Sequence, residues 1–315
     1  MATENVTTVT EFLLLGFVYG PDLEIVLFVA LFLVYLVTVL GNGLIIALIC
    51  INHRLHSPMY FFLSNLSFIE IFMTSCIVPK MLANLLAERK AISFAGCFVQ
   101  SYFYFFMGST EFILFAAMAF DRYMAICYPL RYPTLMTGTV CVKMVVGSWV
   151  GGFLSVFLPT VLKVRLPYCG PNIINHFFCD SAPLLHLACK DISHIELIDF
   201  IGSLILLLGS LSFTAASYIY IIRTILKIPS ADGRKKAFAT CASHFTVVSM
   251  GYGISIFIYA RPSQSDIMSM NKALAIFSGI LTPLLNPFIF SLRNEQMKEV
   301  FGDNLKSIIS KIKGG

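Results

Sequence analysis

Two carboxylic acids, Glu70 and Glu111, lie deep within long apolar stretches of this 315-residue sequence. An ionised side chain in the middle of a membrane is costly, so an intramembrane carboxylate marks a candidate functional site. Asn286, in a third apolar stretch, is placed to approach both acids. Two neighbouring carboxylates do not both ionise without a cation, which favours a shared proton or a bound sodium ion. The alternative is a neutral hydrogen-bonded pair that holds three helices together.

A second polar pattern, Asp121-Arg122-Tyr123, ends an apolar stretch that runs from residue 94 to residue 127. Asp or Arg at the centre of a membrane helix costs about 2.5–3.5 kcal/mol, so at a helix end the pair is either a simple interfacial anchor or a switch. Further motif residues fall at matching places in other apolar stretches, which favours the switch. They are Tyr218, Lys236, His244, Asn286, Pro287 and Phe290.

Two His-x-x-Cys pairs, His176 with Cys179 and His186 with Cys189, have spacings that could supply four ligands to zinc or copper. Outside a cell, however, neighbouring cysteines more often form disulfides, whose sulfurs are poor ligands. We therefore expect no metal centre here, and no cofactor apart from the sodium ion considered for Glu70 and Glu111.

Seven apolar stretches position these groups. Hydrophobic residues make up 57% of the sequence and charged residues 12%, about half the usual share of a soluble domain. About 20 apolar residues cross the ~30 Å hydrocarbon core, and each crossing segment must be helical because lipid offers no hydrogen bonds. We predict an all-α bundle of seven transmembrane helices at 24–291, surrounded by membrane lipid. An outer segment, 1–23, precedes it, and a cytoplasmic segment with a short amphipathic helix, 292–315, follows. The spans are 24–50, 58–86, 94–127, 140–162, 197–226, 238–260 and 271–291.

The basic residues predict the orientation. With the N-terminus outside, 14 of the 22 Lys and Arg residues fall on the cytoplasmic side, as the positive-inside rule requires. The net charge of +5 is then a topology signal and gives no reason to expect a nucleic-acid partner. Asn5 begins a glycosylation sequon on the outer side. Cys97, Cys169, Cys179 and Cys189 also lie on that oxidising side, where spacing alone leaves three pairings open.

A candidate ligand site lies between the outer halves of the third, fifth, sixth and seventh helices. Its residues are aromatic, aliphatic or hydroxyl-bearing, which suits a small neutral organic molecule that accepts a hydrogen bond from Tyr259, Ser109 or Ser203. The alternative for each is ordinary helix packing, in which small residues allow close approach. The candidates are Tyr104, Phe105, Gly108, Ser109, Phe112, Gly202, Ser203, Leu206, Tyr252, Ser255, Ile256, Tyr259, Ile276, Ser278 and Gly279.

Four longer motifs carry a family resemblance. They are Met118-Ala-Phe-Asp-Arg-Tyr-Met-Ala-Ile-Cys127, Lys236-Ala-Phe-Ala-Thr-Cys-Ala-Ser-His244, Pro58-Met-Tyr-Phe-Phe-Leu-Ser-Asn-Leu-Ser67 and Pro283-Leu-Leu-Asn-Pro-Phe-Ile-Phe290. With these, the chain resembles a tetrapod-type (class II) olfactory receptor of the rhodopsin-like G-protein-coupled receptor superfamily, from Glu11 to Asn294. Three positions depart from the family pattern: Phe120 and Phe290 stand where Tyr is usual, and Glu70 where Asp is usual.

The resemblance implies a function as well as a fold. It implies odorant binding from the outer side, coupling to the olfactory stimulatory G protein with a rise in cyclic AMP, and residence in the plasma membrane of olfactory cilia. It also implies a sodium site near Glu70 and disulfides that join Cys97 to Cys179 and Cys169 to Cys189. Amine receptors of the superfamily carry Asp where this chain has Tyr104, so a protonated amine would lack its counter-ion.

Other functions fit the sequence less well. A transporter or channel would be expected to show an internal repeat or spans broken by Gly and Pro in matching halves, and neither is visible. A peptide or lipid receptor on the same fold stays open, although an outer segment of about 22 residues offers little surface to a large ligand. No catalytic dyad stands out, so we do not expect an enzyme.

Overall fold

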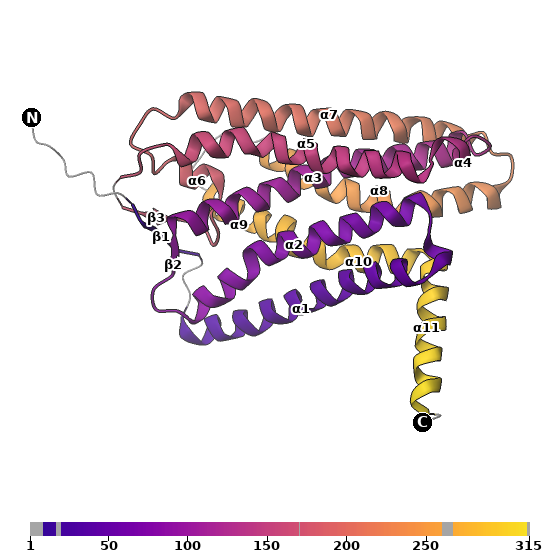
Figure 1. Cartoon of the computed structure of the whole chain (residues 1–315), viewed down its shortest axis with the longest axis horizontal. Coiled ribbons are helices and arrows are strands. Elements are labelled where there is room, and N and C mark those ends of the chain that lie inside the picture. Colours follow the sequence, from indigo (N-terminus) through magenta and orange to yellow (C-terminus); the bar gives the residue numbers. More distant parts are fainter. Residues whose placement is uncertain (1–8, 17–19, 170, 260–266, 314–315) are drawn as a thin grey trace, which may run out of the picture.

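The protein is a bundle of long helices that run side by side (Figure 1). The structure is a computed structural model, which describes residues 9–16, 20–169, 171–259 and 267–313. The bundle is built from α1 (Pro21–Ile51), α2 (Pro58–Leu86), α3 (Phe94–Cys127), α5 (Gly138–Val164), α7 (Ser193–Leu226), α8 (Ala231–Tyr259) and a last helix in three parts. Those parts are α9 (Ile267–Ile276), the π-helical turn Phe277–Leu281 and α10 (Thr282–Arg293). Short helices connect them: the 3-10 helix His53–Leu55, α4 (Tyr132–Leu135) and α6 (Ser181–Leu185).

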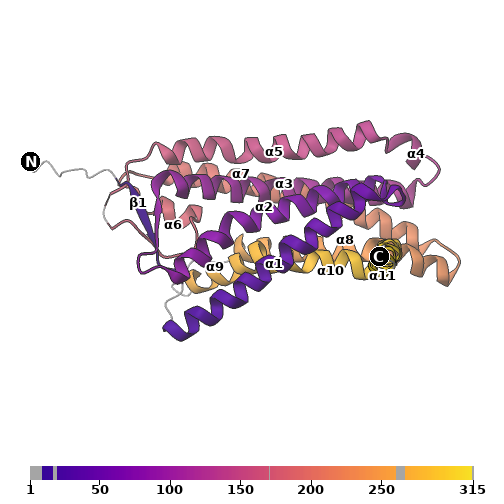
Figure 2. The ribbon, with the colours of Figure 1, turned by 60° about the horizontal axis from the view of Figure 1, so that its bottom comes forward.

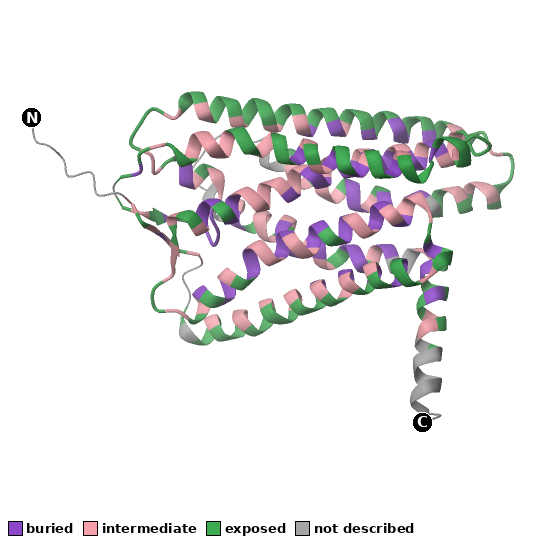
Figure 3. Ribbon diagram, in the orientation of Figure 1, coloured by how far each residue is buried: buried purple, intermediate pink, exposed green. Residues whose placement is uncertain are grey.

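Length and apolar composition confirm the predicted bundle. Among the described residues, six helical segments are long and apolar enough to cross a membrane, in α1, α2, α3, α5, α7 and the last helix from Met270 to Phe290. The seventh, α8, has 29 residues and measures about 43 Å at 1.5 Å per residue, so it is also long enough. Figure 3 shows the exposed residues along these helices in green. Many of them are large and hydrophobic, as expected where lipid is the solvent.

A small sheet covers the end of the bundle that lies near the N-terminus (Figures 1 and 2). Strand β1 (Glu11–Leu14) pairs antiparallel with β2 (Ala91–Ser93) and parallel with β3 (Ile173–Ile174). Phe12 is fully buried under it, 5.7 Å from the ring of Phe94 and 5.8 Å from that of Tyr168. The sequence analysis did not predict this sheet. We call this end of the bundle the sheet end.

The opposite end carries Arg122 and the last helix of the chain, and we call it the Arg122 end. Here α11 (Glu295–Lys313) turns away from the bundle axis, as the two views together show (Figures 1 and 2). Met297 and Val300 on α11 are buried against the bundle, while Gln296 and Lys298 beside them are exposed. This pattern agrees with the amphipathic helix predicted after the seventh span.

Helix α3 crosses α5 at an unusually close approach. A Cβ atom at Gly152 would lie 2.8 Å from the backbone nitrogen of Thr110, and the side chain of Ile113 occupies the space beside Gly151. Small residues allow this kind of crossing because the two backbones can approach until they are almost in contact. The crossing fixes the position of α3, which carries more of the candidate functional residues than any other helix.

Replacing Gly152 by alanine is therefore expected to destabilise the protein. The new methyl group would meet backbone, which does not yield as a side chain does, and overpacking of this kind costs about 1–3 kcal/mol. The matched control is Gly147→Ala, on the same helix, where a Cβ meets nothing among the described residues within 4 Å. Thermal unfolding of both purified variants tests the prediction, which fails if they unfold at the same temperature.

Candidate functional site

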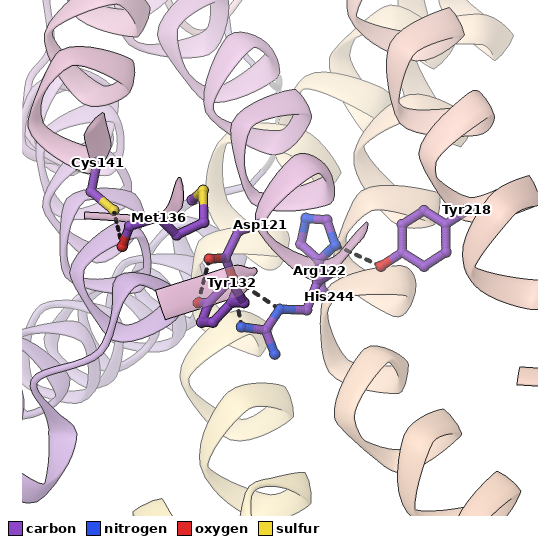
Figure 4. A network of polar contacts seen from close by, with 7 residues as sticks. All are labelled: Asp121, Arg122, Tyr132, Met136, Cys141, Tyr218 and His244. Atoms are coloured by element: carbon purple, nitrogen blue, oxygen red, sulfur yellow. Dashed lines mark hydrogen bonds and ion pairs between the residues drawn. The ribbon is translucent and has the colours of Figure 1, made fainter. Parts of the chain in front are cut away.

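Asp121 and Arg122 form a closed ion pair at the Arg122 end of α3 (Figure 4). The Arg122 guanidinium donates to Asp121 Oδ2 through Nη2 at 2.6 Å and Nε at 3.1 Å. The hydroxyl of Tyr132, on α4, donates to Asp121 Oδ1 at 2.7 Å. Burial raises the pKa of Tyr132 above its usual range, and the nearby negative charge of Asp121 raises it further. The Tyr132 hydroxyl therefore stays protonated and can donate. Both oxygens of a fully buried carboxylate are thus satisfied.

Tyr218 and His244 form a second contact beside this pair, between α7 and α8 (Figure 4). The Tyr218 hydroxyl lies 2.6 Å from His244 Nδ1, and the two rings are stacked. Ser243 also joins α8 to α10, through a hydrogen bond from its hydroxyl to the Ile289 carbonyl at 3.2 Å. Arg122 and Tyr218, both predicted switch residues, therefore have different partners in this arrangement.

The remaining predicted switch residues lie around this end of the bundle. The Tyr123 ring lies 5.8 Å from that of Tyr220 on α7. Phe290 is buried in the main core, Pro287 lies against Gly41 of α1, and Lys236 is exposed on the first turns of α8. Their roles in switching stay predictions.

Glu70 sits in a buried polar cluster between α1, α2 and α10. Asn286 Nδ2 donates to Glu70 Oε1, in agreement with the expectation that Asn286 approaches this acid from the seventh helix. Asn42 donates to the carbonyl oxygens of Thr38 and Pro283, each at 3.1 Å. Three buried oxygens are left without a hydrogen-bond partner among the described residues: Glu70 Oε2, Asn42 Oδ1 and Asn286 Oδ1. Buried oxygen acceptors without donors are the kind of atoms that a hard cation or an additional proton would satisfy.

An aromatic and hydroxyl-bearing cluster occupies the half of the bundle nearer the sheet end. Tyr104 on α3 lies with its hydroxyl 3.4 Å from Ser278 Oγ and its ring 4.8 Å from that of Phe178. Two turns along α3, Phe112 lies 5.2 Å from the ring of Tyr252 on α8. The structure thus brings together candidates from the third, sixth and seventh membrane helices.

Other ligand candidates lie at or outside the margin of this cluster. Gly202 and Ile256 are exposed, and the structure does not join them to the aromatic cluster. Tyr259 ends α8, but its side chain lies outside the described residues, as does Asn5. The rest are half-buried on the bundle helices, apart from Gly279, which is buried against Tyr104. The half-buried ones are Phe105, Gly108, Ser109, Ser203, Leu206, Ser255 and Ile276.

The structure joins Cys97 to Cys179 and Cys169 to Cys189, the two pairs that the resemblance implies. Both cysteines of the metal alternative are therefore disulfide sulfurs. His176 is buried. Burial, and to a lesser extent the positive charge of Lys272, lowers the pKa of His176 to about 3. His186 is exposed and faces Glu196 at 3.9 Å, so the two His-x-x-Cys pairs do not supply four metal ligands.

Comparison with known proteins shows which family the chain belongs to. The family model described as "Olfactory receptor" matches residues 31–307, most of the chain. The chain belongs to the olfactory receptor family. Human olfactory receptor 6J1 is 55% identical to this receptor over 94% of the chain and 85% of its own length. Human olfactory receptor 6X1 is 49% identical, over 93% and 94%. Mouse olfactory receptor 6E1 is also 49% identical, over 96% of each chain.

Membership of the family defines the general activity. The protein is an odorant receptor, a multi-pass protein of the plasma membrane that binds small molecules and couples to a G protein, and it is not an enzyme. The buried pair at Arg122 and the aromatic cluster at Tyr104 and Phe112 lie toward opposite ends of the receptor's bundle.

Three residues of the receptor make polar contacts that were not anticipated from sequence. Tyr132 reaches Asp121 from a four-residue helix, and no sequence signal marks it as a partner. Lys272 Nζ donates to the Gly16 carbonyl and to Asn175 Oδ1, each at 2.7 Å, and so ties the last membrane helix to the sheet end. Lys163 pairs with Asp199 at 2.5 Å. For the two lysines, the sequence feature that could have pointed to these contacts was a basic residue near the end of an apolar span.

Proposed function

We propose that this receptor binds small, neutral, volatile organic molecules at the aromatic cluster and activates an olfactory stimulatory G protein, which raises cyclic AMP. The chemistry of the cluster supports this: Tyr104, Phe112 and Tyr252 offer ring surfaces and hydroxyl groups. The position of Tyr104 provides no carboxylate for a cationic amine. A ligand of ten heavy atoms gains about 5–8 kcal/mol from such contacts, which corresponds to weak, broad recognition.

We propose that the sheet end faces the outside and the Arg122 end the cytoplasm, in the membrane of olfactory cilia. The distribution of Lys and Arg supports this orientation, as does the position of the two disulfides near the sheet end.

The mechanism we propose is a two-state equilibrium of the bundle. The odorant shifts it by binding the active arrangement more tightly, because only differential affinity changes the populations. In the active arrangement the Arg122 end of α8 moves outward. The Tyr218–His244 contact then breaks, and Arg122 leaves Asp121 to contact the G protein together with Tyr218.

Loss of one hydroxyl donor at the cluster is expected to weaken the odorant response. Ser109→Ala and Tyr259→Phe should each shift the dose–response curve to about two- to tenfold higher concentration, the value of one hydrogen bond. Cyclic AMP is measured in cells that co-express the receptor and the olfactory stimulatory G protein, challenged with neutral volatiles.

The control for this experiment is Ser155→Ala, because the Ser155 hydroxyl bonds the Gly152 carbonyl within α5, outside the cluster. It should respond as the unsubstituted receptor does. Identical curves for all variants would place the ligand elsewhere, and a response that needs a different G protein would exclude the stimulatory type.

We further propose that the cluster around Glu70 holds a sodium ion, and that the second buried acid, Glu111 on α3, contributes to the site. The three unpartnered oxygens of Glu70, Asn42 and Asn286 support a cation site. Binding at this site should stabilise the purified receptor by about 1.4 kcal/mol when the sodium concentration is ten times the dissociation constant. Potassium at equal ionic strength should not.

Glu70→Gln is expected to remove that sodium-specific stabilisation, because the amide carries no charge. Glu299→Gln, an exposed acid on α11, is the control and should retain it. Thermal unfolding in sodium and in potassium chloride measures the difference. Equal unfolding temperatures of the unsubstituted receptor in both salts would favour the alternative of a protonated, neutral pair.

A further inference from the structure

A long apolar groove opens on the lipid-facing surface of the receptor between α3, α5 and α7. Its volume is about 560 Å³, and it lies in the half of the bundle that contains Arg122. Ile113, Ala116 and Phe120 line it from α3, Met144 and Gly147 from α5, and Phe213 from α7. The hydroxyl of Ser148, also in the lining, is satisfied by the Met144 carbonyl at 2.9 Å. The groove therefore suits an apolar occupant.

The close helix crossing explains why the groove is there and where it ends. At Gly151 the side chain of Ile113 fills the space between α3 and α5, which closes the groove near the middle of the membrane. One turn nearer the Arg122 end, a Cβ on Gly147 would meet nothing among the described residues within 4 Å. From Gly151 to Val140 at the far end, α5 rises about 16 Å, which is half the ~30 Å hydrocarbon core. The groove thus has the depth of one leaflet.

Two exposed basic residues lie toward the Arg122 end of the helices that form the groove. Lys143 on α5 lies one turn from Gly147, and Arg223 lies near the end of α7; both are exposed. Neither forms an ion pair within the part of the chain that the structure describes. The sequence places no Asp or Glu in α5 or in residues 200–226 of α7, and Asp121 on α3 is buried and already paired.

Aromatic side chains form the wall of the groove on the α7 side. The Phe120 ring lies 6.1 Å from that of Phe213 and 6.2 Å from that of Tyr123, which in turn packs on Tyr220. Phe213 is 49% exposed, so a large apolar side chain is available at the mouth. These ring contacts extend from the groove-lining residues Phe120 and Phe213 to Tyr123, on the turn of α3 that carries Asp121 and Arg122.

We propose that this groove is a binding site for an anionic phospholipid from the leaflet on the Arg122 side. One acyl chain lies between α3, α5 and α7, with its end at Ile113 and Gly151. The phosphate and the anionic headgroup lie at Lys143 and Arg223. The depth of the groove matches one chain of one leaflet, and the two basic residues on α5 and α7 select the headgroup by charge.

Photolabelling tests the site. The receptor is reconstituted in bilayers that contain a phosphatidylserine with a photoreactive group on one acyl chain, and the labelled peptides are mapped. We expect labels on residues 113–120 and 140–148. Gly147→Leu should reduce labelling of these peptides at least about fivefold, because the side chain extends into the groove from a position where a Cβ meets no described residue within 4 Å. Gly43→Leu is the matched control: a Cβ there also meets no described residue within 4 Å, but α1 contributes no lining residue.

The headgroup part of the proposal has its own variant. Lys143→Gln is a surface substitution that leaves the apolar lining intact. It should reduce the preference for phosphatidylserine over phosphatidylcholine about fivefold, the effect of about one unit of charge near a membrane surface. Equal labelling of Gly147→Leu and the unsubstituted receptor would overturn the site. Stronger labelling of the groove by a photoreactive sterol, or no headgroup preference, would overturn the assigned occupant.

Discussion

Arg122→Ala is expected to reduce the odorant-evoked cyclic AMP response to the level of cells that lack the receptor, while the receptor still reaches the cell surface. In the resting arrangement the guanidinium is held by Asp121, so its loss removes the group that the proposed mechanism delivers to the G protein. Asp121 is not left without a donor, because the Tyr132 hydroxyl remains at 2.7 Å. A buried carboxylate that keeps a donor is less costly than one that loses all of them.

Surface staining and cyclic AMP, measured on the same cells, separate loss of coupling from loss of folding. Arg54→Ala is the matched control: Arg54 lies at the same end of the bundle, but its ion pair with Asp303 is exposed. Exposed pairs contribute about 0–1 kcal/mol, so this variant should signal normally. A normal response from Arg122→Ala would refute the proposed mechanism.

The spans could be predicted because the bilayer requires a fixed apolar length. The predicted bounds of the second and third spans, 58–86 and 94–127, are those of α2 and α3. The sixth span was predicted to begin at 238, but α8 begins at Ala231. Hydropathy detects the part of a helix that lies in lipid, whereas the first turns of α8 carry Arg234, Lys235 and Lys236. The helix continues beyond the stretch that the pattern detects.

The sheet could not be predicted, for a different physical reason. Its strands have four, three and two residues, too few to show an alternating pattern. Their partners are also far apart in sequence, since Leu13 pairs with Ala91 and with Ile173. Such pairing depends on the bundle and the disulfides that bring the three segments together. The sequence of residues 11–14 alone does not indicate this pairing.

The candidate sites were predictable to the extent that depth in the membrane determines contact. Glu70 was placed near mid-membrane with Asn286 able to approach it from the seventh helix, and the two side chains are hydrogen-bonded. Rotation of a helix about its axis is harder to predict in a uniformly apolar segment, because no polar face marks the outside. Gly202 and Ile256 show this: both lie at the expected depth, yet both are exposed.

Cys97→Ser is expected to remove most of the receptor from the cell surface. The Cys97–Cys179 disulfide closes a segment of 82 residues and joins the start of α3 to the segment beneath the sheet. By the chain-entropy argument, a loop of this length contributes about 4.5 kcal/mol, compared with about 3.3 kcal/mol for the 20-residue loop of Cys169 and Cys189. The larger value is a large fraction of a typical folding free energy of about 5–15 kcal/mol. Cys169→Ser should therefore be the milder variant.

Flow cytometry with an N-terminal epitope tag compares these variants, and Cys50→Ser, an exposed free thiol, is the control that should be expressed normally. The double variant Cys97→Ser/Cys179→Ser makes the test specific to the bond. If the disulfide carries the effect, the second substitution adds almost nothing to the first, because two partners of one interaction are not additive. If the two losses add, each cysteine acts through its own packing, since both side chains are fully buried, and the disulfide is not the cause.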